Sequence, residues 1–151
     1  IAAISNYEHM ETDELIVKQA NREGKKYHDL SDENFLRIEK DVFMKLGDLS
    51  GKVIDTGASV IYDQDVMCKI AEFAHVVYIE DSIDVIEDRF IARGPVPLMG
   101  IEGKTFKQLF AERQPLYEEY AQSTVTRDRF RDNDALLVAE QILELVRDDE
   151  S

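Results

Sequence analysis

Hydrophobic and polar positions repeat along the chain with two periods, one typical of buried strands and one typical of helices. Short apolar runs at Val53–Asp55 and His75–Glu80 end in polar residues, which predicts parallel strands buried on both faces. Shorter runs at Tyr7–Met10 and Ser123–Thr126 predict two further strands. The chain is therefore expected to contain at least these four strands.

The stretches between the strands carry the helical period, with apolar residues three or four positions apart on one face. Ser31 opens one such stretch, Gly24 ends the stretch before it, and Pro115 predicts a kink or a break in a later one. The predicted helices cover Leu15–Ala20, Phe35–Leu46, Asp65–Phe73, Ile83–Phe90, Thr105–Tyr120 and Ala135–Val146.

Strands that alternate with helices predict an α/β fold of three layers, in which a parallel sheet lies between helices. The 151 residues contain no internal repeat, no low-complexity segment and no linker, so we expect a single domain over residues 1–151. With 44% hydrophobic and 33% charged residues, the composition is that of a globular domain rather than a disordered chain.

The formal net charge of −14 argues against a nucleic-acid surface and against binding to anionic membranes. It does not argue against a phosphorylated ligand, because a site can be locally basic within an acidic protein. The single cysteine, Cys68, excludes an intrachain disulfide and favours a cytoplasmic protein. Because Cys68 lies within an apolar helical pattern, we expect it to be a small core residue.

Polar residues follow two of the strands, at the edge where open parallel sheets bind ligands. Gly57 and Ser59 lie in the first such turn, and they fit either a binding loop or an ordinary turn with a serine helix cap. Glu11 and Asp13 fit either a carboxylate pair for a cation or hydroxyl, or a helix N-cap. Arg37 is either an exposed ion-pair partner or an anion-binding arginine.

The ordered set of motifs resembles the shikimate kinase family of small P-loop kinases over almost the whole chain. The stretch Arg113–Tyr117, which reads Arg-Gln-Pro-Leu-Tyr, is the most specific single match. The matching stretches, in order, are Glu11–Ile16, Phe35–Glu39, Thr56–Ser59, Val76–Ile79, Arg93–Met99 and Glu112–Tyr117. The resemblance implies a P-loop kinase-like fold and the phosphorylation of shikimate at its 3-hydroxyl, with ATP and Mg²⁺ as cofactors.

The resemblance also implies which residues contact the small-molecule acceptor. Asp13 matches the aspartate that orients the acceptor hydroxyls and takes part in catalysis. Gly57, Ala58 and Ser59 match the glycine triad that lines the acceptor, with two departures from glycine. Arg113 matches an arginine that binds the acceptor carboxylate.

On the nucleotide side the resemblance assigns Arg89 to the adenine and Glu11 to the magnesium ion. Arg93 is the candidate for the catalytic lid arginine. The family's second carboxylate arginine has Leu36 in its place, and Arg37 is the candidate substitute. A neighbouring residue points about 100° away on a helix.

The sequence contains no Gly-x-x-x-x-Gly-Lys-Ser/Thr, the phosphate-binding P-loop of the family. Residues Ile1–Ile4 align with the end of the helix that follows this loop, so we expect the loop and the first, central strand to lie upstream. By this interpretation the 151 residues alone are inactive. Two alternatives stay open: a kinase of another small hydroxy acid such as gluconate, and a non-catalytic kinase-like binding domain.

Overall fold

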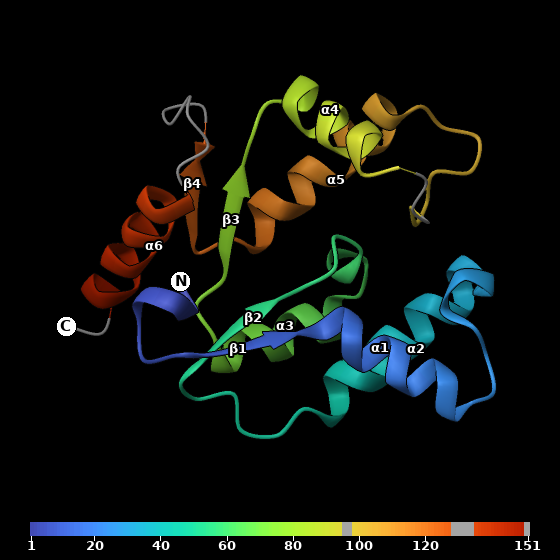
Figure 1. Cartoon of the computed structure of the whole chain (residues 1–151), viewed down its shortest axis with the longest axis horizontal. Coiled ribbons are helices and arrows are strands. Elements are labelled where there is room, and N and C mark those ends of the chain that lie inside the picture. The colour runs from blue at the N-terminus through green and yellow to red at the C-terminus, as the bar shows by residue number, and fades with distance from the viewer. Residues whose placement is uncertain (95–97, 128–134, 150–151) are drawn as a thin grey trace. The chain divides into compact units, whose positions relative to one another are not determined.

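The computed structural model describes residues 1–94, 98–127 and 135–149 (Figure 1). The chain divides into two compact units, which are described one at a time. The N-terminal unit comprises Asn6–Ala74 with Ala2, and the C-terminal unit comprises His75–Ser151 with Ile1 and Ala3–Ser5. No helix in the described ranges is both long enough and apolar enough to cross a membrane.

The N-terminal unit is built on two parallel strands, β1 and β2, that run in register from Glu8 opposite Lys52 to Glu11 opposite Asp55. The carboxyl ends of both strands therefore lie at the same edge. The elements of this unit are β1 (Glu8–Glu11), α1 (Thr12–Arg22), the 3₁₀ turn η2 (Tyr27–Asp29), α2 (Asp32–Lys45), β2 (Lys52–Asp55), the 3₁₀ turn η3 (Val60–Tyr62) and α3 (Gln64–Phe73).

The apolar faces of α1 and α2 form the core of this unit. Ile16 and Ala20 of α1 meet Ile38 and Val42 of α2 in one buried cluster. As the sequence predicts, Ser31 is the N-cap of α2: its hydroxyl accepts a hydrogen bond from the backbone N–H of Asn34. At the other end of α2, the ammonium group of Lys69 donates to three backbone carbonyls at the end of the helix, those of Phe43, Met44 and Leu46.

The C-terminal unit has its own pair of parallel strands, which run in register from Val77 opposite Ser123 to Glu80 opposite Thr126. Its core joins Val125 to Val138 and Ile142 of the last helix. The elements are β3 (Val77–Glu80), α4 (Ile83–Arg93), α5 (Phe106–Tyr120), β4 (Ser123–Thr126) and α6 (Ala135–Asp149), after the 3₁₀ turn η1 (Ala2–Ile4) at the start of the chain.

The structure confirms an α/β fold with parallel strands and flanking helices (Figure 1). Within the described ranges, however, the strands form two separate sheets, and β2 and β3 each have one strand neighbour. The expectation of a further, central strand stays a prediction, as does the single domain. The prediction that the strands are buried on both faces is wrong. Ile79 of β3 is 46% exposed, because a two-stranded sheet has few neighbours to cover each face.

One local prediction is also wrong. Cys68 is exposed, because the buried face of α3 is formed by Val66, Met67 and Ile70, and Cys68 points away from it. Helix α5 continues through Pro115, so the predicted break does not occur. The alternative of a kink at Pro115 stays a prediction.

Tyr78 of β3 carries a polar group that the fold leaves without a partner. Its ring stacks on that of Tyr117 from α5, with ring centroids 5.2 Å apart and an interplanar angle of 20°. Within the described ranges, the buried hydroxyl of Tyr78 makes no hydrogen bond. Burial raises the pKa of Tyr78 to about 12, and the nearby charge of Glu80 adds to the shift.

We expect this hydroxyl to make folding stability depend on pH in the alkaline range. The unfolded chain releases the tyrosine proton near pH 10, whereas the folded chain holds it to about pH 12. The stabilisation is therefore complete below pH 10 and lost as the pH rises through 12. In denaturant unfolding at several pH values, Tyr78→Phe should remove this dependence and be no less stable at pH 8. Tyr27→Phe, the control, should keep it. An unchanged alkaline fall in Tyr78→Phe would contradict the assignment.

Candidate functional site

Two carboxylates approach the backbone at Gly57, in the turn that follows β2. A Cβ atom at Gly57 would lie 3.3 Å from Oδ1 of Asp13 and 3.3 Å from Oε1 of Glu39. The two oxygens are therefore no further apart than twice that distance. Gly57 is not one of the glycines with a positive φ, so the requirement for glycine at this position comes from the close approach of the two side chains.

Glu39 is held in place by Ser59. Both residues are buried: Glu39 is 2% exposed and Ser59 is 5% exposed. The Ser59 hydroxyl lies 3.0 Å from Oε1 and 3.1 Å from Oε2 of Glu39. A buried carboxylate needs such a donor, because burial without hydrogen bonds costs several kcal/mol. The alternative of a helix cap holds for the position of Ser59 but not for its hydroxyl. Ser59 is the N-cap residue of the single turn η3, yet its hydroxyl makes no cap hydrogen bond and donates to Glu39 instead.

Asp13 lies in the first turn of α1, where the positive end of the helix dipole favours a carboxylate. It is not the N-cap, because α1 begins at Thr12 and the N-cap position belongs to Glu11, which makes no side-chain cap. Thr12 is fully buried, and its hydroxyl donates to the backbone carbonyl of Asp55 at 3.0 Å. This bond ties the start of α1 to the end of β2 and thereby places Asp13 beside Gly57.

Glu11, the predicted magnesium ligand, ends β1 directly opposite Asp55 at the end of β2. Two acidic residues thus end neighbouring strands. Within residues 1–94, 98–127 and 135–149, no group of three or more His, Cys, Asp or Glu side chains is arranged to hold a metal ion. The metal role of Glu11 stays a prediction.

Arg37 lies in an exposed cluster of charges. Its guanidinium donates to both carboxylate oxygens of Glu23, and it lies 3.0 Å from Oδ2 of Asp41. The hydrogen bond from Arg37 lowers the pKa of Glu23 to about 2, and the same bond raises the pKa of Arg37. The substrate role of Arg37 stays a prediction, and the contacts seen here are ion pairs.

In the C-terminal unit, Arg113 is a buried arginine on α5. Only 5% of it is exposed, and its Nη2 donates to the backbone carbonyl of Met99 at 2.6 Å. Leu109, four residues earlier, belongs to the same buried face. A guanidinium is always charged and presents five donors in a rigid fork, so a buried one is suited to binding a carboxylate.

Arg89 is bound to Asp81, a buried carboxylate directly after β3. Asp81 accepts from Nη1 of Arg89 at 2.7 Å and from the backbone N–H of Ser82 at 3.0 Å, and Nε of Arg127 lies 3.8 Å away. The Arg89 side chain remains 47% exposed. Sequence reasoning did not find Asp81, although an acidic residue at the end of an apolar strand is the kind of signal that marks such a site.

Arg93, the predicted lid arginine, is the exposed last residue of α4. Residues 95–97 of the predicted lid lie outside the described ranges. The lid role therefore stays a prediction.

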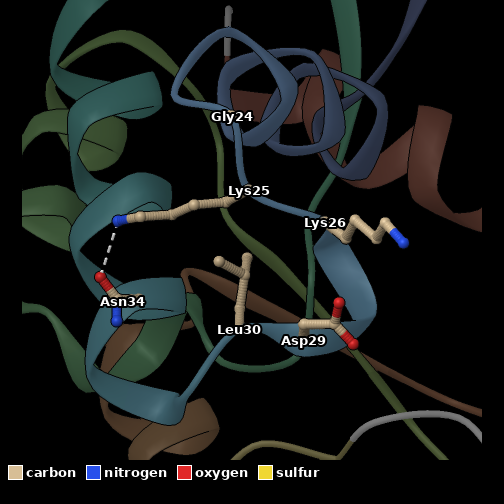
Figure 2. A pocket seen from close by; sticks show the side chains of 6 residues that line it. All are labelled: Gly24, Lys25, Lys26, Asp29, Leu30 and Asn34. Carbon is tan, nitrogen blue, oxygen red and sulfur yellow. Dashed lines mark hydrogen bonds between the residues drawn. The ribbon is translucent and has the colours of Figure 1, made fainter.

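A hollow of about 370 Å³ lies at the far end of α1 from Asp13 (Figure 2). Figure 2 shows Lys25 reaching across it to Asn34, at 2.9 Å between Nζ and Oδ1. The residues that line it are Gly24, Lys25, Lys26, Asp29, Leu30 and Asn34. None of the predicted site residues is among them, and the length of α1, about 1.5 Å per residue, separates the hollow from Asp13.

The N-terminal unit thus brings three predicted residues together, Asp13, Gly57 and Ser59, while the predicted Ala58 between the last two is exposed. Sequence reasoning missed the buried role of Glu39. The available signal was its position four residues after Phe35 and three before Val42, on the apolar stripe of α2.

Comparison with known proteins gives one consistent answer. The sequence model described as "Shikimate kinase" matches residues 1–147. The shikimate kinase of Mannheimia succiniciproducens is 27% identical over 97% of this chain and 84% of its own length. That of Francisella philomiragia is 30% identical over 78% of this chain and 69% of its own. The crystal structure of shikimate kinase from Bacteroides thetaiotaomicron has a TM-score of 0.70 at 20% identity, covering 94% of this chain and 85% of that one.

The geometry at Gly57 predicts different outcomes for two glycine-to-alanine substitutions. In Gly57→Ala the new methyl group forces the carboxylates of Asp13 and Glu39 to move by a few tenths of an ångström. Overpacking of this kind costs about 1–3 kcal/mol, and here we expect the lower end because side chains can yield. Gly47→Ala is the matched control: nothing lies within 4 Å of its new methyl group, so its free energy of unfolding should be unchanged or slightly higher. Equal denaturant midpoints for the two variants would contradict the close approach.

Proposed function

The chain belongs to the shikimate kinase family, and from this we propose that it transfers a phosphoryl group from ATP to the 3-hydroxyl of shikimate. The observation that carries the proposal is the approach of the Asp13 carboxylate to Gly57 at the carboxyl ends of two parallel strands. Open α/β sheets bind their ligands at this edge. A carboxylate in this turn gives an acceptor hydroxyl a hydrogen-bond partner.

In the proposed reaction Asp13 orients the acceptor hydroxyl and accepts its proton as the oxygen attacks the phosphorus. Phosphoryl transfer leaves little covalent chemistry to the protein, so alignment and charge neutralisation supply most of the catalysis. Asp13 is exposed in the described structure, which makes it accessible to a ligand. Gly57, Ala58 and Ser59 form the backbone wall against which the acceptor lies.

Arg113 binds the carboxylate of the acceptor in this proposal. Its Nη2 donates to the Met99 carbonyl, which fixes the orientation of the guanidinium. A paired, buried guanidinium binds a carboxylate more strongly than an exposed one, because less water competes for it. Arg37 would add a second positive charge only after leaving its ion pairs with Glu23 and Asp41.

The family implies ATP, and the C-terminal unit offers residues that fit parts of it. Asp81 holds one edge of the Arg89 guanidinium, while 47% of the Arg89 side chain stays exposed. An adenine ring could therefore stack on the exposed face of this cationic group. Arg93 would neutralise charge on the transferring phosphoryl group.

Glu11 fits a magnesium ion by its donor chemistry. Mg²⁺ takes oxygen ligands and is commonly held by one or two carboxylates together with phosphate and water, and Glu11 faces a second carboxylate, Asp55, across the strand ends. When bound, the ion neutralises phosphate charge.

Because the 151 residues contain no Gly-x-x-x-x-Gly-Lys-Ser/Thr, we propose that they do not turn over ATP by themselves. Assays of kinase activity therefore need a phosphate-binding loop in addition to these residues. The single cysteine supports a cytoplasmic location.

One observation favours a second acceptor class. Leu36 occupies the position at which the family pattern has an arginine that binds the acceptor carboxylate. In addition, Ser59 in the Gly57–Ser59 turn is hydrogen-bonded to the buried carboxylate of Glu39. These two features suit an acceptor that depends less on binding through its carboxylate and has more hydroxyl groups, such as gluconate. A kinase assay with shikimate, gluconate and related hydroxy acids separates the two, and no transfer to any of them would favour a non-catalytic binding domain.

We expect Arg113→Lys to raise the KM for shikimate by about tenfold or more with a smaller effect on kcat, because an ammonium group cannot make the forked contact. Asp13→Asn should instead lower kcat by about 10²–10⁴-fold, the usual contribution of a positioned proton acceptor. The control is Arg22→Lys, an exposed arginine at the end of α1. If Arg113→Lys leaves the KM unchanged while the variant stays folded, the proposed carboxylate role is wrong.

A further inference from the structure

Asp81 is a buried carboxylate at the point where β3 leads into α4. Only 8% of the residue is exposed, and its Oδ1 accepts a hydrogen bond from the backbone N–H of Ser82, the N-cap residue of α4. Its Oδ2 accepts from Nη1 of Arg89 at 2.7 Å and lies 3.8 Å from Nε of Arg127, which directly follows β4. One buried carboxylate therefore joins the end of β3, helix α4 and the end of β4.

The contact with Asp81 sets where the guanidinium of Arg89 lies. Arg89 is on α4, about two helical turns after the N-cap Ser82, and long side chains on a helix point back toward its N-terminus. The side chain of Arg89 reaches the start of the helix in this way and donates to Asp81 there. Its guanidinium therefore lies at the carboxyl ends of β3 and β4, the edge at which open α/β sheets bind ligands.

The arginine is fixed at one edge without being covered. The Arg89 side chain is 47% exposed, whereas that of Asp81 is 8% exposed. A planar guanidinium that donates through its edge keeps a face on which an aromatic ring can stack. Without the carboxylate, the long side chain would regain its rotational freedom, and the positive charge of Arg127 beside the same oxygen would repel it. Asp81 thus holds the guanidinium ready for a ligand before the ligand arrives.

We propose that Asp81 is a positioning residue for the nucleotide base, because it fixes Arg89 as the platform on which the adenine ring stacks. The inference rests on the proposed function for its ligand, whereas the contacts that carry it all lie within the C-terminal unit. Asp81 does not contact the base and acts through Arg89. Its consequence is that the affinity for the base depends on Asp81 only while Arg89 is present.

The test is a double-mutant cycle with Asp81→Asn, Arg89→Ala and the two combined. Adenosine is titrated into the isotopically labelled 151 residues, and the backbone amide resonances of α4 are followed. Adenosine carries the base without phosphate, so its binding does not need a phosphate-binding loop. Each single substitution should weaken adenosine binding by about three- to tenfold, the contribution of a stacked cation. The combined variant should bind adenosine no more weakly than Arg89→Ala.

The matched control is Asp84→Asn, at an aspartate of the same helix that is 77% exposed and paired with Lys107. It should leave adenosine binding unchanged. The denaturant midpoint shows whether each variant is folded. If Asp81→Asn does not fold, Asp81→Glu takes its place, because it keeps the negative charge but displaces the guanidinium by one methylene group. The affinity for shikimate should be the same in all variants, since a general loss of structure would weaken both ligands.

Three outcomes would overturn the proposal. The first is a lower midpoint in Asp81→Asn with unchanged adenosine affinity, which would show a purely structural role. The second is a further loss of affinity when Asp81→Asn is added to Arg89→Ala, and the third is no saturable shift on α4 in the unmodified chain. If adenosine binds as expected but shikimate is not phosphorylated in the presence of a phosphate-binding loop, the proposed function fails and the role of Asp81 stands.

Discussion

The candidate site depends on one electrostatic constraint: two carboxylates must be held at a fixed separation while both lie close to a single glycine. Separately, each is easy to explain. Asp13 lies at the positive end of a helix, and Glu39 is buried with a hydroxyl donor. Together at Gly57 they repel each other, so their separation has to be fixed by the surrounding structure.

The fold supplies that fixation through short, local connections. The parallel register of β1 and β2 brings both strand ends to one edge, and the hydrogen bond from Thr12 to the Asp55 carbonyl sets where α1 begins. The α1–α2 core then places Glu39, which follows the buried Ile38 on α2. Catalytic geometry is sensitive to displacements of about 1 Å, so a site of this kind requires such a rigid frame.

Much of this frame follows from the sequence. The strand at Ser123–Thr126 and the N-cap at Ser31 are as predicted, because both depend on local patterns that neighbouring residues determine. The turn at Gly57 is marked as a binding loop by its place after an apolar strand and by its family pattern. The close approach that explains its glycine involves atoms from α1 and α2, and it is visible only in the structure.

The remaining features depend on side-chain partners that are distant in the sequence. From its neighbours in the sequence, Ser59 is expected to be a helix cap. Only the packing of α2 against the turn shows that Glu39 accepts the hydrogen bond of the Ser59 hydroxyl. Cys68 has apolar neighbours in the sequence but lies off the buried face of α3. Asp81 and Arg89 are eight residues apart, and neither residue type alone distinguishes a buried ion pair from an exposed one. Periodicity predicts which face of an element is buried, but it does not identify the partner of a polar group on that face.

The most direct test of the account is a titration of the isotopically labelled protein with shikimate, followed by the backbone amide resonances. At 17.4 kDa the 151 residues are small enough for residue-by-residue assignment. We predict saturable shifts at Asp13 and at Gly57–Ser59, with little change at the lysine-lined hollow of Lys25 and Lys26. Saturable shifts confined to that hollow, or none at Gly57 under saturating shikimate, would contradict the claim that the two carboxylates and their glycine form the acceptor site.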